Sequence, residues 1–227
     1  MASSNTLRPA ALAALLALGA SSALATNGYF AHGYGVKSQG MAGASTALAQ
    51  DGFAGANNPA AAAFAGDRLD VGASLFNPER SASRTTPEGS QTAQSGHEVF
   101  LIPEFGYNRR LSDQIGIGLT VYGNGGMNTS YPAESNGYNM LGGQGKLGVD
   151  MSQLIVAPTL AYKLSESHAV GVSPLLVYQR FAVRGLQAFA GMSQDSSKLT
   201  NNEHDSSTGF GLRLGYQGQL GNQITVG

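Results

Sequence analysis

A short sequence pattern recurs three times in this chain, each time as a polar turn between two runs of alternating apolar residues. The copies begin at Tyr107, Tyr162 and Tyr216, so they lie 55 and 54 residues apart. In each copy an aromatic residue ends one run, a polar turn follows, and a new alternating run begins. A unit of two strands and one long loop, repeated at constant period, predicts a sheet built hairpin by hairpin. The third copy ends a few residues into its second strand, so we expect the chain to be a fragment.

Six runs of the chain have the period of two that is typical of strands. One face of each run is apolar, and the other face is small, polar or sometimes charged. The runs cover residues 69–75, 99–107, 115–121, 154–162, 170–178 and 210–216. Three of them contain a proline that removes a ladder hydrogen bond, and we interpret these prolines as local bulges or kinks. They are Pro103, Pro158 and Pro174.

The connections between the runs alternate between short and long. Short turns are expected at residues 108–113, 163–168 and 217–222, and long polar loops at 77–97, 124–149 and 182–206. Short turns at one end and long loops at the other are typical of an outer membrane β-barrel, in which the three tyrosines would join the aromatic girdle. The alternative is a secreted β-sandwich, which would cover its apolar face with a second sheet.

The two folds differ in where the apolar phase of the runs points. In a barrel this phase faces the membrane, whereas in a sandwich it lies inside a closed apolar core. The fold class we predict is therefore an all-β, transmembrane antiparallel barrel over residues 67–227, with about six strands and part of a seventh. The residues that test this orientation are Val99, Leu119, Val156, Val172 and Leu212.

The first 25 residues predict export. Arg8 supplies a positive charge, an apolar stretch runs from Ala10 to Ala20, and a small-x-small cleavage pattern ends at Ala25. The apolar stretch is too short for a membrane-spanning helix, which needs about 20 residues. We therefore assign residues 1–25 to a signal peptide and expect the mature chain to begin at Thr26.

Composition and residue spacing exclude several kinds of site. The chain has no cysteine, and without Arg8 it carries 13 − 1 = 12 basic against 14 acidic residues, which argues against a nucleic-acid surface. His204-Asp205 lies near several serines, but no nucleophile, base and orienting group are spaced as a unit, so we expect no enzyme. None of the four histidines has a metal-ligand spacing, and no cofactor or metal is expected. These are His32, His97, His168 and His204.

Residues 26–66 form a segment rich in Gly and Ala that we interpret as a plug inside the barrel. We expect a short helix over residues 40–51, and a second one in which Asn58 is the cap and Pro59 lies in the first turn. Close packing against the small, polar inner face is expected from five residues of the segment. They are Gly40, Ala42, Gly43, Ala44 and Ala47.

Part of this segment resembles a known family. The order Gly40-Met-Ala-Gly-Ala44, then Asp51, then Asn58-Pro59-Ala60 is similar to the N-terminal hatch of FadL/TodX outer membrane transport proteins. Residues 184–189 and 205–211 also look like members of that family. The resemblance implies a fourteen-stranded, monomeric barrel of about twice this length. It also implies uptake of long-chain fatty acids or aromatic hydrocarbons through a loop groove, a hatch-gated pocket and a lateral opening.

The third long loop holds the candidate substrate site. Leu186, Phe189 and Met192 recur at intervals of three, near one face of a short helix, and an exposed apolar patch often marks a ligand site. The face could instead pack on the loop's own neighbours. Arg180 and Arg184 are suited to a substrate carboxylate or to lipopolysaccharide phosphates.

Two functions in the outer membrane are thus open. The first is diffusive uptake of a hydrophobic small molecule, favoured over a wet porin because few charges face inward. The second is an adhesin or surface-structural barrel that acts through its long loops and needs no plug. The inward charges are Asp70, Glu104, Lys163 and Arg213.

Overall fold

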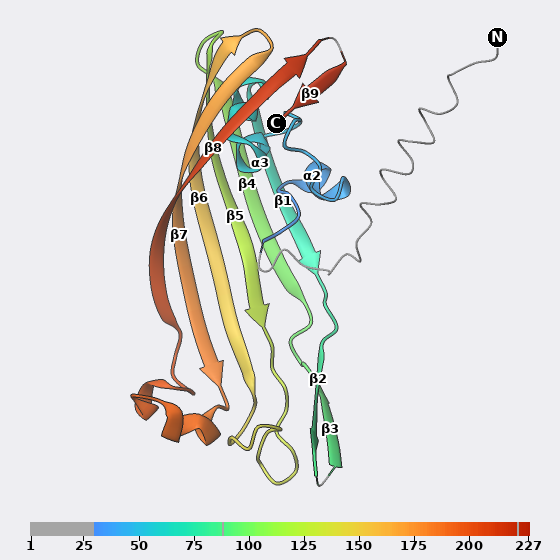
Figure 1. Cartoon of the computed structure of the whole chain (residues 1–227), viewed down its shortest axis with the longest axis vertical. Helices are drawn as coiled ribbons and strands as arrows, with labels where there is room; N and C mark the ends of the chain where they lie inside the picture. Colours follow the sequence, from blue (N-terminus) through green and yellow to red (C-terminus); the bar gives the residue numbers. More distant parts are fainter. Residues whose placement is uncertain (1–29, 88, 222) are drawn as a thin grey trace, which may run out of the picture.

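The computed structural model describes residues 30–87, 89–221 and 223–227, and the predicted signal peptide lies outside them. A long, curled antiparallel sheet dominates the molecule, and the N-terminal segment lies against its inner face (Figure 1). The sheet has seven strands in the order β1-β4-β5-β6-β7-β8-β9, and β2 and β3 form a separate hairpin. The main strands are β1 (Arg68–Phe76), β4 (Phe100–Arg110), β5 (Ile115–Asn128), β6 (Gly148–Ser165), β7 (His168–Arg184), β8 (Asp205–Leu220) and β9 (Ile224–Val226).

Each predicted run falls almost wholly within one strand, but several strands are longer than predicted. β6 has 18 residues and β7 has 17, and both extend toward the long loops. In these extensions the pairs of Gln153 with Gln179 and Arg180 with Ser206 are polar, and apolar pairs such as Met151 with Phe181 occur only in the phase opposite to the apolar phase of the predicted runs. Backbone pairing therefore continues where the apolar phase of the predicted runs stops, which is why the sequence pattern does not reveal the full strand length.

The register keeps the two faces of the sheet separate. Val156 pairs with Val121 on one side and Leu176 on the other, so an apolar row crosses three strands. Val99 and Leu212 are 63% and 65% exposed, and Leu119, Val156 and Val172 are half-buried. Within the described residues no second sheet covers this face. The predicted outward orientation is confirmed, and the sandwich alternative is excluded.

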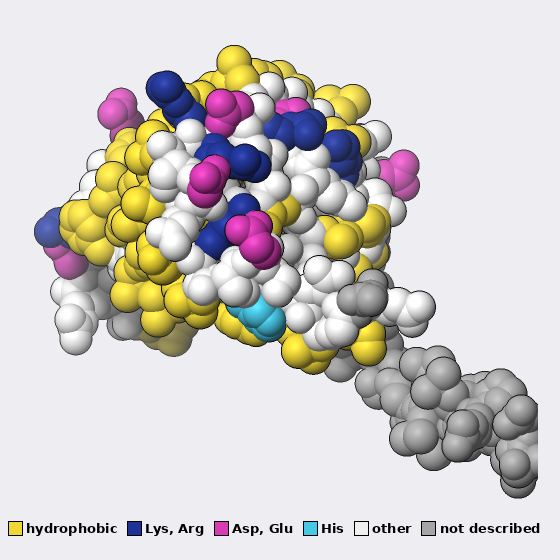
Figure 2. All heavy atoms as spheres, turned by 90° about the horizontal axis from the view of Figure 1, so that it is seen from above, with side chains coloured by type: hydrophobic (Ala, Val, Ile, Leu, Met, Phe, Trp, Pro, Cys, Tyr) yellow, Lys and Arg dark blue, Asp and Glu magenta, His cyan; other side chains and the backbone are white. Residues whose placement is uncertain are grey.

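The two ends of the sheet differ as predicted. Short turns at residues 111–114 and 166–167 lie at the upper end of Figure 1, where β8 also ends, and the long connections lie at the lower end. Seen from the short-turn end, hydrophobic side chains lie along the margin and charged side chains gather nearer the middle (Figure 2). The tyrosines of the repeat each lie four or five residues before a short turn, and Tyr162 and Tyr216 both pair with Val170.

The first long loop, predicted at residues 77–97, contains regular structure. It contains a two-stranded hairpin, β2 (Ser81–Thr86) and β3 (Gly89–Gln94). Hydroxyl groups hydrogen-bond across it, Ser83 with Thr92 at 2.8 Å and Thr85 with Ser90 at 2.9 Å. Because both faces are polar, the hairpin has no apolar alternation by which the sequence could show it.

The interpretation of Pro158 and Pro174 as bulges is wrong. These residues oppose each other between β6 and β7, where backbone pairing is missing for residues 157–159 and 173–175. The register is the same on both sides of this gap, so no residue is inserted. On the inner face the hydroxyls of Thr159 and Ser173 bridge the gap at 2.6 Å.

No helix among the described residues is long and apolar enough to cross a membrane.

Candidate functional site

The N-terminal segment has an exposed part and a buried part. Its helices are α2 (Val36–Gly40), α3 (Ala54–Asn57) and the 3-10 helix η1 (Pro59–Ala63). Residues 51–56 and 58–63 are all buried against the sheet, near its short-turn end (Figure 1). Most of residues 36–44 are exposed among the described residues. The buried part therefore makes the main contact with the sheet.

Glycines on four strands of the sheet make room for this contact. A Cβ atom on Gly106 of β4 would lie 2.6 Å from the carbonyl carbon of Gly52, and one on Gly116 of β5 would lie 2.5 Å from the Ala62 carbonyl oxygen. Cβ atoms on Gly171 and Gly215 would overlap Pro59 and Asn58. The segment can approach the strands this closely only because these positions carry no side chain.

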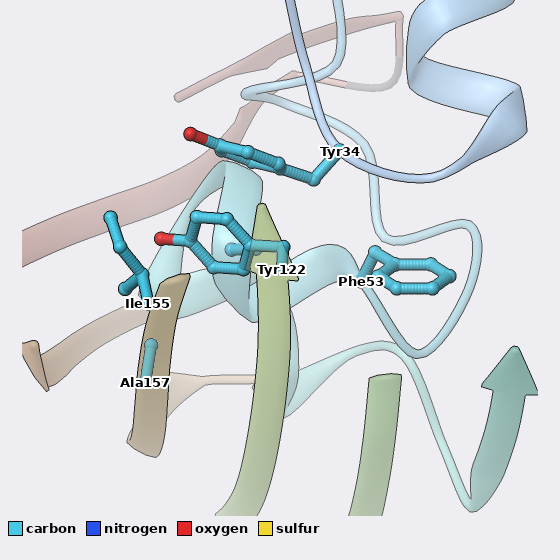
Figure 3. Packing of buried hydrophobic residues seen from close by; sticks show 6 residues of the cluster. Tyr34, Phe53, Tyr122, Ile155 and Ala157 are labelled. Carbon is cyan, nitrogen blue, oxygen red and sulfur yellow. The ribbon is translucent and has the colours of Figure 1, made fainter. Parts of the chain in front are cut away.

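An aromatic cluster and an alanine cluster fill the interface between the segment and the sheet. Tyr34 and Phe53 of the segment pack with Tyr122, Ile155 and Ala157 of the strands (Figure 3). The rings of Tyr34 and Tyr122 have centroids 3.9 Å apart and are tilted by 40°. The second cluster joins η1 to β6 and β7 and consists of Ala60, Ala62, Ala63, Ala161 and Ala169.

The charged residues that the sequence places on the inner face all contact the segment. The Gly52 amide donates to the Asp70 carboxylate at 2.8 Å, and the Gly35 amide donates to Glu104 at 3.0 Å. The Arg213 guanidinium donates to the Ala56 carbonyl, and the Lys163 ammonium lies 5.3 Å from the centre of the Phe64 ring. These charges therefore hold the segment in place, a role that the sequence pattern did not reveal.

Two asparagines anchor η1. The Asn58 side chain accepts from the Ala60 amide at 3.0 Å, as predicted for a cap, and donates to the Tyr216 carbonyl at 2.8 Å and the Thr46 carbonyl at 2.7 Å. Asn108 of β4 donates to the carbonyls of Ala62 and Gly66, at 3.0 and 2.7 Å. The cap and the first-turn Pro59 are confirmed, while Asn108 was missed because it is one polar residue among several on the inner face.

The expected helix over residues 40–51 is wrong. α2 ends at Gly40, and the backbone then turns through left-handed conformations at Ala42 (φ 53°) and Gly43 (φ 86°). The expected packing against the sheet is also wrong for Gly40 and Gly43, whereas Ala47 does lie close to Gly227, directly after β9. A Cβ atom on Gly40 would have no neighbour within 4 Å, and one on Gly43 would meet the backbone of His32 at 3.0 Å. Gly43 thus serves a local turn, and residues 52–63 contact the sheet instead.

Burial changes the acidity of two groups in the segment. Burial raises the pKa of the Asp51 carboxyl, although a hydrogen bond from the Phe53 amide at 3.0 Å partly opposes this. Burial also raises the pKa of the Tyr34 hydroxyl well above its usual range, and this hydroxyl donates to Asn124 of β5 at 2.7 Å. Tyr34 is therefore a neutral hydrogen-bond donor that links the segment to β5 of the sheet.

Strand pairing in the sheet is irregular next to Tyr34. Pairing between β4 and β5 stops at Glu104 and Tyr122, although both strands continue toward the long loops. The register between β5 and β6 shifts between Gly123 and Gly126. Asn124 lies within this stretch, and its amide donates to Gln153 at 2.7 Å. The lateral contact between β4 and β5 is thus incomplete on the loop side of the segment.

The third long loop contains the predicted short helix. It is the 3-10 helix η2 (Gln187–Met192), followed by a second 3-10 turn, η3 (Ser196–Lys198). A 3-10 helix has three residues per turn, so Leu186, Phe189 and Met192 project to one side. Met192 is 77% exposed, whereas Leu186 and Phe189 are half-buried. This face therefore packs partly on the loop and partly remains open.

The two candidate arginines are placed differently. Arg184 ends β7, two residues before Leu186, and is exposed. Arg180 lies four residues further into the strand. It lines an open groove of about 590 Å³ together with His97 and Asp150. His204 approaches Asp150 at 2.9 Å, rather than pairing with Asp205 as a hydrolase would require. Arg184 thus lies next to the apolar face along the chain, whereas Arg180 lies in a separate groove.

Comparisons with known proteins agree with this architecture. The family model described as "Outer membrane protein transport protein (OMPP1/FadL/TodX)" matches residues 16–227. The toluene transporter TodX of P. putida is 18% identical, with a TM-score of 0.67 over 86% of this chain and 54% of that one. A FadL homologue of Pseudomonas aeruginosa is 16% identical, with a TM-score of 0.54 over 77% of this chain and 46% of that one.

A third solved structure, a TodX deltaS2S3 mutant monoaromatic hydrocarbon channel, is 18% identical, with a TM-score of 0.61 over 83% of this chain and 52% of that one. A search of the curated proteins found no match. The chain spans about half the length of the solved structures that it matches.

Proposed function

Because this chain belongs to the OMPP1/FadL/TodX family of outer membrane transport proteins, we propose that it forms part of a channel for diffusive uptake of hydrophobic small molecules. The substrates we propose are monoaromatic hydrocarbons or long-chain fatty acids. The first class is suggested by two matched structures, a toluene transporter and a monoaromatic hydrocarbon channel, and the second by the family resemblance. The channel needs no energy-coupling chemistry within this chain.

The observation that carries this proposal is the occupation of the inner face by residues 30–66, which we propose to be a hatch. A porin for ions and sugars keeps its lumen polar and water-filled. Here Glu104 is 6% exposed and accepts a hydrogen bond from the hatch, and the other inward charges also contact the hatch. An adhesin that acts through its loops would need no such segment, so the buried hatch favours uptake over that alternative.

We propose the apolar face of η2 as the site of first capture. Each apolar methylene removed from water contributes roughly 0.8 kcal/mol, so contact with Phe189 and Met192 gives useful affinity for a dilute hydrophobic molecule. Arg184 would meet a substrate carboxylate or, at the cell surface, a lipopolysaccharide phosphate. Phe189 lies beside Leu186 and is only half-buried, which leaves part of its ring for a ligand.

We propose that substrate leaves sideways, through the wall between β4 and β5. The support for this exit is the end of backbone pairing at Glu104 and Tyr122 and the register shift beyond Gly123. An exit at this height would release a hydrophobic molecule into the membrane without passing the buried part of the hatch. The Tyr34 side chain lies beside it, because its hydroxyl contacts Asn124.

Replacing Phe189 with aspartate in the full-length protein tests the capture site. A charge on this face should raise the substrate concentration needed for half-maximal uptake by roughly tenfold, since it opposes apolar burial. The matched control is Gln194→Asp, which adds the same charge to an exposed position of the same loop. Equal uptake by Phe189→Asp and Gln194→Asp, at limiting substrate and matched surface levels, would contradict the assignment.

The substrate class can be tested at Arg184. Arg184→Ala removes a cation two residues before Leu186, so it should weaken uptake of a fatty acid severalfold and leave uptake of toluene unchanged. Uptake assays with radiolabelled oleate and toluene on the same membranes would show the difference. Loss of neither substrate would remove Arg184 from the site.

A further inference from the structure

The second long loop contacts the third one through a buried side chain, Asn139. Residues 129–147 lie at the loop end of the sheet, where Tyr131 and Leu147 pair through their backbones at 2.7 and 3.0 Å. At the tip of this loop Asn139 is only 4% exposed. Such burial is unusual for an asparagine in a surface loop and calls for a physical explanation.

Asn139 uses both ends of its amide. Its side-chain oxygen accepts from the amides of Leu141 at 2.9 Å and Gly143 at 3.3 Å, and these bonds fold the tip of its own loop. Its nitrogen donates to the Gly145 carbonyl at 3.3 Å and to the Gly185 carbonyl at 3.0 Å. Gly185 belongs to the third loop and immediately precedes Leu186, the first residue of the apolar face.

The backbones of the two loops are packed together at this point. Gly185 has a left-handed backbone (φ 82°), and a Cβ atom there would lie 2.5 Å from both the Asn139 amide nitrogen and the Lys146 carbonyl. A Cβ atom on Gly143 would overlap the Gly185 carbonyl. From the other side, the Asn201 side chain accepts from the Gly185 amide at 3.0 Å. The start of η2 is therefore held between the second loop and the Asn201 side chain near the end of the third loop.

We infer that Asn139 is a positioning residue for the capture helix η2, and this inference rests on the proposed function. Its donated bond to Gly185 fixes the start of η2 and so the direction in which Phe189 and Met192 project. The second loop thus contributes to substrate capture without presenting an apolar surface of its own. A preorganised face binds more tightly because less conformational freedom is lost when the ligand arrives.

Two substitutions separate this role from simple folding of the second loop. Asn139→Asp keeps the oxygen that accepts from Leu141 and Gly143 but cannot donate to Gly185, whereas Asn139→Ala loses both functions. Asn136→Ala is the matched control, because Asn136 is exposed and accepts only within its own loop, from the Tyr138 amide at 2.9 Å. All three variants are made in the full-length protein.

The first measurement is hydrogen exchange of residues 185–192. We expect faster exchange in Asn139→Asp and Asn139→Ala but not in Asn136→Ala. The second measurement is uptake, in which both Asn139 variants should raise the half-saturating substrate concentration roughly fivefold, as expected for loss of a buried hydrogen bond. The maximal rate should not change, because the pore itself is intact.

The outcomes distinguish the two proposals. Unchanged exchange in Asn139→Asp would overturn the positioning role, because the bond to Gly185 would then not hold η2. Faster exchange with wild-type half-saturation would keep the positioning role and contradict η2 as the capture site. A wild-type result for Asn139→Asp in both measurements, with a defect in Asn139→Ala, would reduce Asn139 to a folding residue of its own loop.

Discussion

The two longer 3-10 helices of this protein, η1 and η2, have the same local structure and opposite surroundings. All five residues of η1 are buried, whereas η2 has no fully buried residue. Both are short, with five residues in η1 and six in η2. What differs is the surface beneath them, because η1 lies on strands whose inward positions are glycine or alanine and η2 lies beyond the ends of the strands. The burial of each short helix therefore follows from the strand surface beneath it.

The largest effect is expected where the sheet receives η1. Gly171→Ala should lower the stability of the segment's contact by about 1–3 kcal/mol, since the added Cβ atom overlaps the backbone of Pro59. In liposomes carrying the full-length protein, the variant should leak small solutes. The control is Gly209→Ala, whose Cβ atom would meet only Val177, at 3.7 Å. A tight Gly171→Ala barrel would show that η1 is not seated as described.

A smaller effect is expected from the cap of η1. Asn58→Ala removes the cap and the bonds to Tyr216 and Thr46, so the helix should lose about 1–2 kcal/mol. Limited proteolysis between the segment and β1 should then become faster. The comparison is Asp195→Ala, which removes the cap of the exposed helix η3. Equal resistance of both variants to proteolysis would mean that the Asn58 cap stabilises η1 no more than the Asp195 cap stabilises η3.

The smallest effect is expected at Asp51. Burial raises the pKa of this carboxyl in the folded state, so its contribution to stability is present at low pH and is lost as the pH rises through the raised pKa. Asp51→Asn keeps an acceptor for the Phe53 amide and cannot ionise. Thermal unfolding measured across acidic pH should therefore show a small decline with rising pH in the wild type that is absent from the variant. Identical pH profiles would mean that burial does not govern this group.

The sequence predicted the parts of the fold that follow from apolar alternation. The six runs, their outward phase and the short-turn end were readable because each apolar row faces one environment over several residues. The β2–β3 hairpin was not, since both of its faces are polar, and neither were the ends of β6 and β7, where the apolar phase of the runs does not continue. A local rule also sufficed for the Asn58 cap, which depends on a residue two positions away.

The contacts of the segment could not be predicted in the same way. Gly52 meets Gly106 and Asn58 meets Tyr216, pairs that are far apart in the chain and carry no periodic signal. The small residues at 40–47 predicted tight packing, but Ala42 and Gly43 form a left-handed turn there. Glycine can signal either a turn or a close approach, and only the three-dimensional partner decides between them.

The spacing of the tyrosine rows sets the membrane thickness that this protein suits. Val170, paired with Tyr162, and Tyr178, paired with Leu154, lie eight residue steps apart on β7. At about 3.3 Å per residue and a tilt of about 40°, this apolar band is roughly 20 Å tall. That height matches a thin hydrocarbon layer, and a thicker bilayer would have to compress or the barrel would have to tilt. Reconstitution in short-chain lipids should therefore preserve the native sheet. Long-chain lipids would instead strain the incomplete contact between β4 and β5.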